Sequence, residues 1–266
     1  MRRIPPRRAG CRTARRLGRL ALAGLAVIAA LTGGLARAES PLVAELEALV
    51  NRYHEDFGRI DTIRAELEQA VRDDPAPRSY LALARAHVLW GDIRATTTEQ
   101  KLAAYAAGRE AARRATELAP RDALAHVLYG VSTARWGQAK GILRSLTLLP
   151  DVRAATRRSL ELDPRLAVAY ALAGYVDFEV PAVFGGSLER AEEAFRTGLQ
   201  LDPRFTAMRV GLARVLVRQD RLAEARRELE AVLAETAPTS LADWTVKDRP
   251  RAEKLLATLP RPAGSG

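Results

Sequence analysis

Cysteine and histidine are scarce in this chain of 266 residues. Cys11 is the only cysteine, and no two of the three histidines, His54, His87 and His126, lie one helical turn apart. One thiol cannot form a disulfide framework, and a zinc site needs several imidazole or thiolate ligands close together. The sequence therefore predicts no metal ion, no cofactor and no cysteine nucleophile.

Catalytic sequence motifs are missing as well. The chain contains no Gly-x-Ser-x-Gly turn that would present a nucleophilic serine, and no phosphate-binding glycine loop. Its carboxylates lie beside arginines at helical spacing, as in Glu189, Glu192, Glu193 and Arg196, which is typical of solvated helix faces. We therefore expect a protein that is not an enzyme.

Acidic residues are absent from residues 1–38, which carry nine of the 42 basic residues. The rest of the chain holds 33 basic and 32 acidic residues, so its net charge is about +1, against +10 for the whole sequence. Binding to a phosphate backbone needs a basic stripe that displaces counterions. This balance predicts that nucleic acid is not a partner.

The same 38 residues have the organisation of an export signal. A basic stretch from Arg2 to Arg19 precedes 17 uncharged, mostly apolar residues from Leu20 to Ala36. Ala36-Arg37-Ala38 then forms a small-x-small cleavage site, which would leave Glu39 as the new N-terminus. We expect a periplasmic or secreted protein without a stable membrane span after cleavage. The alternative is an uncleaved N-terminal membrane anchor.

Aromatic residues make up only 5% of the chain, whereas alanine, leucine, arginine and glutamate dominate. These four residue types are strong helix formers. Apolar residues recur at spacings of three and four, as in Val210, Ala213, Leu216 and Val217, which is the period of a helix face and not of a strand. The fold class predicted is all-α.

Prolines divide the chain into repeated units. Pro75, Pro120, Pro164, Pro203 and Pro238 are separated by 45, 44, 39 and 35 residues, and three of them end the triplets Leu-Ala-Pro or Leu-Asp-Pro. We interpret the leucine as the end of one helix, the aspartate as a cap of the next, and the proline as that helix's first residue. Each unit would be an antiparallel helix pair that buries its apolar face only against its neighbours.

The units resemble the tetratricopeptide repeat (TPR). The third unit matches the repeat's pattern at Tyr170, Ala173-Gly174, Ala191, Phe195, Gly198 and Pro203. The repeat places the small residues of its two helices 12 positions apart, as Ala213 and Ala225 are, while the earlier units stretch this spacing to 24, 22 and 17. The resemblance implies a TPR-like α-solenoid of about four helix-pair units, with extended turns between the first (A) and second (B) helix of a pair.

The predicted organisation follows from these patterns. It comprises a signal segment (1–38), N-terminal capping helices (39–77), TPR-like repeats (78–238), a C-terminal capping helix (239–259) and a tail (260–266).

One loop and one tail carry a narrower resemblance. Residues 180–187 (Val-Pro-Ala-Val-Phe-Gly-Gly-Ser) before a helix, and the terminal Arg-Ala-Glu-Lys-Leu-Leu of residues 251–256, are similar to two groups of divergent TPR proteins. One is the periplasmic T-component associated with tripartite substrate-binding transporters, and the other is the regulator-of-microtubule-dynamics type. The export signal favours the bacterial envelope group.

Candidate binding residues fall in two sets. The TPR resemblance places certain first-helix residues in a concave groove, where arginines and aromatics suit carboxylates: Arg78, Arg85, Arg135, Tyr175, Phe178, Arg214 and Arg218. The second set lies in two apolar segments of the expected A–B turns, 142–149 and 180–184, and includes Leu146 and Phe184. These would form the wall of a pocket with Tyr175 and Phe178 as its floor and Arg135 holding an acidic group.

Two functions remain open on this basis. The first is an exported adaptor that binds a protein partner in the cell envelope. The second is an accessory protein of a transport system, similar to the T-component, that binds a small acidic or amphipathic ligand. An open groove would favour the adaptor, and an enclosed channel would favour the ligand-binding protein.

Overall fold

The computed structural model describes residues 40–260, in which every regular element is a helix and no strand occurs. The expected signal segment, the cleavage point before Glu39 and residues 261–266 of the tail lie outside these described residues.

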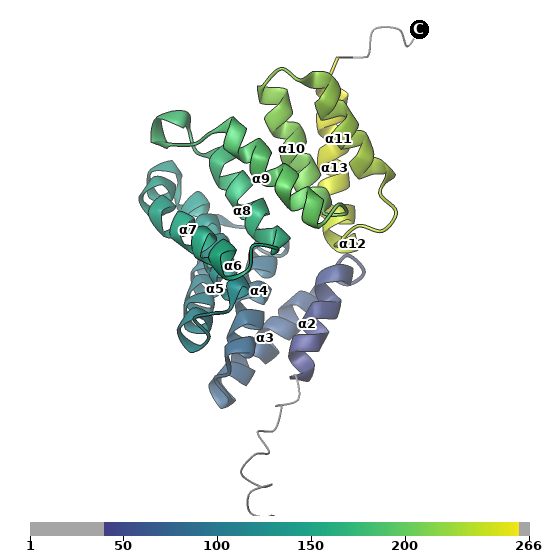
Figure 1. Ribbon diagram of the computed structural model, residues 1–266. Coiled ribbons are helices and arrows are strands. Elements are labelled where there is room, and N and C mark those ends of the chain that lie inside the picture. Colours follow the sequence, from purple (N-terminus) through teal and green to yellow (C-terminus); the bar gives the residue numbers. More distant parts are fainter. Residues whose placement is uncertain (1–39, 261–266) are drawn as a thin grey trace, which may run out of the picture. The chain divides into compact units, whose positions relative to one another are not determined.

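Four antiparallel helix pairs follow one another along the chain (Figure 1). They are α4 (Pro77–Ile93) with α5 (Thr98–Leu118), α6 (Ala123–Lys140) with α7 (Ile142–Leu162), α8 (Ala167–Glu179) with α9 (Leu188–Leu201), and α10 (Thr206–Arg218) with α11 (Leu222–Ala234). Each helix of α4 to α10 also packs against a neighbouring pair, and α11 packs against α13. The predicted TPR-like all-α solenoid is confirmed.

Small residues lie where helices touch, both within a pair and between successive pairs. A Cβ atom on Gly174 would be 2.6 Å from the ring of Phe195, and one on Gly130 would be 2.8 Å from the side chain of Leu172. Ala213 and Ala225 are fully buried in the fourth pair. Their lack of bulk lets the backbones approach closely enough for the apolar faces to interlock.

The extra residues of the first two pairs lengthen helices instead of turns. Helices α4 to α7 have 17 to 21 residues, whereas α8 to α11 have 13 or 14. Gly141 alone, with φ at +106°, reverses the chain between α6 and α7. Only the third pair has an extended turn, because residues 180–186 contain the proline and two glycines that oppose a helix.

The proline markers end helices but do not begin them, so the assignment of proline to the first helical position is wrong. Pro164 and Pro203 lie in turns three residues before α8 and α10 begin. The carboxylates of Asp163 and Asp202 accept N–H bonds from the residue two positions on, at 2.8 and 3.1 Å, which is the geometry of an Asx turn. The Asp-Pro sequences therefore form turns between successive helix pairs.

Short segments flank the repeats at both ends. Helices α2 (Pro41–Arg52) and α3 (Gly58–Asp73) precede them, and α12 (Leu241–Asp243), a π-helical turn η2 (Trp244–Asp248) and α13 (Arg249–Thr258) follow. Helix α13 packs against α11, and α12 packs against α2, as Figure 1 shows. The buried Tyr53 hydroxyl, just after α2, donates to Asp243 at 2.7 Å.

Candidate functional site

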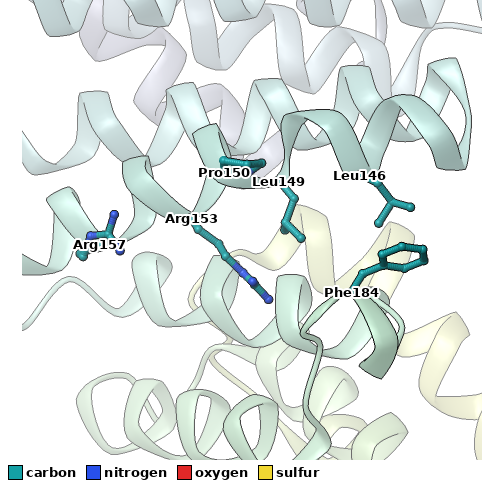
Figure 2. Close-up of a pocket in the computed structure, with 6 residues that line it drawn as sticks. All are labelled: Leu146, Leu149, Pro150, Arg153, Arg157 and Phe184. Carbon is teal, nitrogen blue, oxygen red and sulfur yellow. The ribbon is translucent and has the colours of Figure 1, made fainter.

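A surface pocket of about 430 Å³ lies between the start of α7 and the turn that joins α8 to α9. Leu146, Leu149 and Pro150 form its helical side, and Phe184 faces Leu146 from the turn (Figure 2). Arg153 and Arg157 continue the lining along α7. The structure brings Leu146 and Phe184 together in this pocket.

Backbone geometry sets the position of Phe184. Ala182–Phe184 form a single 3₁₀ turn, η1, and Gly185 follows in the left-handed region with φ at +84°. A Cβ atom on Gly186 would lie 1.7 Å from the carbonyl oxygen of Val180, so only glycine fits there. Ser187 then caps α9 by accepting the N–H of Arg190 at 3.2 Å.

Two arginines from different helices hold this turn. Arg153 of α7 and Arg190 of α9 both donate to the carbonyl oxygen of Gly185, at 2.6 and 2.5 Å. Both also bind the carboxylate of Asp177, at 3.3 and 2.8 Å, whose side chain is only 17% exposed. The pKa of Arg190 is raised by the hydrogen bond to Asp177 and by its charge. The turn is therefore fixed by charge-assisted hydrogen bonds, which are the stronger kind.

The fixed turn leaves large apolar side chains in solvent. Val183 is 85% exposed and Phe184 51%, and at the start of α7 Ile142 is 67% and Leu143 79% exposed. We call the set Ile142, Leu143, Leu146, Leu149, Val183 and Phe184 the loop patch. No acidic side chain lines its pocket, and Arg157 makes no ion pair or hydrogen bond through its side chain within residues 40–260.

Arg135 belongs to a second pocket, of about 510 Å³, formed by α4, α5, α6, η2 and α13. We call it the cationic pocket because five basic side chains line it: Arg94, Lys101, Arg135, Lys247 and Arg251. Asp92 is the acidic lining residue, and it accepts from the Tyr105 hydroxyl at 2.8 Å and from Arg135 at 3.2 Å. Burial, and then the charge of Asp92, raise the pKa of Tyr105.

Lys247 connects the cationic pocket to the first helices. Its ammonium lies 3.6 Å from Asp92 and 2.8 Å from Asp243, which also accepts the hydroxyl of Tyr53. Burial by itself would raise the pKa of Asp243, but Lys247 and the Tyr53 hydroxyl lower it by more. The carboxylate is therefore held ionised.

The single pocket expected from the sequence is not formed. The Tyr175 hydroxyl donates to the carbonyl oxygen of Ala207 at 2.6 Å, and its ring packs edge-on against Phe195. Phe178 is 3% exposed, lies under the guanidinium groups of Arg214 and Arg218, and accepts a hydrogen bond from Arg218 at its carbonyl oxygen. Both aromatics face α10 because α8 packs against α10, so neither is a floor for the loop patch.

The remaining predicted arginines interact with other groups of the protein. Arg85 lies 3.2 Å from Glu47 of α2, and Arg214 lies 3.0 Å from Glu179. Sequence reasoning missed Asp177, Arg153 and the residues that join Arg135 in its pocket, Lys101 and Arg251. Their spacing along the chain carries no signal, since it is the packing of separate helices that brings them together.

Residues 40–260 contain no candidate for a metal site or a membrane span. Among the described residues, no group of three or more His, Cys, Asp or Glu is placed to hold a metal ion. Between residues 40 and 260, no helix combines the length and apolar character needed to cross a membrane.

Comparisons with known proteins agree with this architecture. The family model described as "Regulator of microtubule dynamics protein 1-3" matches residues 42–260. It is one of the two groups that the turn and the tail resemble, while the resemblance to the T-component group stays a prediction. No curated protein matches the chain.

One solved structure shows the same fold, and a second is less similar. TTC0263, a thermophilic TPR protein of Thermus thermophilus, superimposes with a TM-score of 0.59 at 24% identity, over 81% of this chain and 96% of its own. PilF of Pseudomonas aeruginosa gives a TM-score of 0.49 at 18% identity, over 80% of this chain and 88% of its own.

Proposed function

Since the chain belongs to the regulator of microtubule dynamics protein 1-3 family, a family of TPR-like proteins, we propose that it is a non-catalytic adaptor that binds a protein partner through the loop patch. We propose further that it is exported and acts in the cell envelope, as residues 1–38 suggest. We do not extend the proposal to the microtubules of the family's name, because an exported chain would leave the compartment that holds the cytoskeleton.

The observation that carries the proposal is the exposure of large apolar side chains on a turn that is otherwise fully organised. Val183, Phe184, Ile142 and Leu143 are each more than half exposed. Covering each such side chain would contribute roughly 1.5–3 kcal/mol. Because Arg153 and Arg190 already hold the turn, a partner would not have to order it, which favours affinity.

Apolar patches of this kind usually mark contact sites. The alternative, that the two segments only cover each other, predicts low exposure at the turn and at the start of α7. Leu146 and Phe184 do approach each other across the pocket, but their neighbours Val183 and Leu143 are the most exposed of the large apolar residues described. This exposure supports a protein partner over self-covering.

The test is capture by a pair of matched variants. The double substitution Phe184→Ala and Leu146→Ala removes the apolar side chains from both walls of the pocket, and we expect it to abolish partner capture from an envelope extract of the source cells, read by mass spectrometry. The fold should survive, because Phe184 is half exposed and Leu146 is only partly buried. Circular dichroism before and after heating checks the fold.

Leu118→Ala is the control, since Leu118 is also 50% exposed but lies at the end of α5, away from the loop patch. It should capture the same proteins as the parent. A folded double variant that still captures every protein bound by the parent would refute the loop patch as the binding site.

A further inference from the structure

The cationic pocket contains more positive charge than the protein itself neutralises. Arg94 is paired with Asp61 at 2.9 Å, and Arg135 and Lys247 are both directed at Asp92. Lys101 and Arg251 form no ion pair or hydrogen bond through their side chains in the described part of the chain. Two cations without an ion pair therefore share one cavity, although the charge of Arg251 also acts on the carboxyl group of Asp248.

The acidic lining residue does not oppose an incoming anion. The Asp92 side chain is 14% exposed, and its oxygens are occupied by the Tyr105 hydroxyl, Arg135 and Lys247. A carboxylate that is already satisfied on several sides contributes little field to the open part of the cavity. The potential there is set by Lys101 and Arg251.

The cavity also has an apolar side and an irregular element. Phe57, which is 39% exposed, and the partly buried Ile93 and Val246 line it together with the cations. Val246 and Lys247 come from the π-helical turn η2, a kind of turn that is frequent at functional sites. The same turn directs Asp248 away from the cavity, toward Thr206 of α10.

We propose that this pocket binds a small organic dianion, with its two charges on one or two acidic groups and with an apolar body. Lys101 and Arg251 would bind the charged groups, and Phe57, Ile93 and Val246 would contact the body. The volume of about 510 Å³ is within the range of small-molecule sites. The site is separate from the loop patch and does not depend on the adaptor function.

Isothermal titration calorimetry on the full chain tests this with three probes: isophthalate, phenyl phosphate and benzoate. Isophthalate or phenyl phosphate should bind with a Kd below about 1 mM, the weak end of measurable affinity, and the tighter of the two identifies the anion as carboxylate or phosphate. Benzoate should bind at least about tenfold more weakly, because it lacks one charge-assisted contact. Added salt should weaken binding.

Variants locate the site. Lys101→Gln and Arg251→Gln should each weaken binding by about tenfold. Lys101→Gln should leave the melting temperature unchanged because its side chain is unpaired, and circular dichroism checks that both variants fold. Arg227→Gln, an exposed arginine of α11 that does not line the pocket, should bind like the parent. The proposal is overturned if neither dianion binds, if benzoate binds as well as they do, or if Arg227→Gln weakens binding as much as the pocket variants.

Discussion

At the scale of single residues, two buried groups titrate in opposite directions. Asp248 is 2% exposed, and burial, together with the nearby charge of Asp243, raises its pKa to about 6 although Thr206 donates a hydrogen bond to it. His87 is 6% exposed, and burial, together with the charge of Arg64, lowers its pKa to about 4. Glu68 lies 3.6 Å from the ring, which is too far for a hydrogen bond. Burial therefore dominates the pKa of His87, and the ring is neutral.

Both groups affect stability between pH 4 and 6.5, with opposite sign. In the folded state Asp248 holds its proton to higher pH than in the unfolded chain, so its contribution falls as the pH rises from about 4 to 6. His87 binds a proton more readily when unfolded, so its contribution is lost as the pH falls from 6.5 to about 4. The two changes partly cancel.

Asp248→Asn should remove the contribution of Asp248 to the pH dependence of stability. At pH 7 the variant should be more stable by about 2–3 kcal/mol, the cost of a two-unit pKa shift, and its melting temperature should rise by about 5–10 °C. Between pH 6.5 and 4 its melting temperature should fall, because the His87 contribution is no longer offset. Circular dichroism melts at pH 4.5 and 7 measure both effects.

The control is Asp163→Asn, at the turn before α8. Its amide oxygen can accept the same Arg165 N–H, so the melting temperature should change little at either pH. A melting temperature of Asp248→Asn at or below that of the parent at pH 7 would show that the buried carboxylate is not destabilising.

At the scale of elements, the turn between α8 and α9 depends on helices that lie outside it. Its own sequence provides the glycines and the Ser187 cap, but Arg153 comes from α7 and is 24 residues from Asp177. The turn therefore takes its shape only when α7 is packed beside it. This explains how an exposed apolar segment keeps one conformation without a hydrophobic cover.

The double substitution Arg153→Gln and Arg190→Gln should loosen this turn. Amides of residues 181–187 should exchange faster with deuterium, and the partner affinity of the loop patch should fall about tenfold because the turn must then be ordered on binding. The global melting temperature should change little, since both arginines are partly exposed, at 38% and 54%.

Arg158→Gln serves as the matched variant, because Arg158 is also on α7 but pairs only with Glu161 of its own helix. Unchanged deuterium exchange at 181–187 in the double variant would mean that the backbone of the turn is sufficient without the arginines.

At the scale of the whole described unit, the C-terminal segment joins two hydrophobic clusters. Ala242 of α12 belongs to the cluster of α2 to α6, whereas Ala252 of α13 belongs to the cluster of α8 to α13. Tyr53 and Asp243 connect residues 190 positions apart, and the Ser240 hydroxyl donates to the Val50 carbonyl oxygen beside them. Neighbour contacts alone would not link the two ends of a solenoid.

Tyr53→Phe should weaken this link. It removes a hydrogen bond to a charged carboxylate from a fully buried side chain, at a cost of about 2 kcal/mol, or about 4–8 °C in melting temperature. Tyr170→Phe, whose hydroxyl binds the Pro164 carbonyl oxygen only six residues away, should cost less. Equal losses in the two variants would show that the contact between the ends contributes no special stability.

The positions of the helices, their pairing and their closest contacts could be predicted from residue patterns alone. Apolar spacing and small residues such as Gly174 and Ala213 are local consequences of helix geometry, so they could be read without coordinates. The cap at Ser187 and the turn at Gly185-Gly186 are equally local. Leu146 and Phe184 could be paired because both apolar segments were expected in the A–B turns of consecutive units, and such turns lie along one edge of a solenoid.

Which side chains share a cavity depends on how distant helices pack. Residues 142–149 could form a turn or the start of a helix. They form the first turns of α7, because α7 packs along α6. Arg135 meets Lys247 and Arg251 only because η2 and α13 fold back on α4 to α6, and Tyr175 turns to α10 because α8 packs there. Such contacts depend on the relative position of distant helices, which the period of a sequence does not encode.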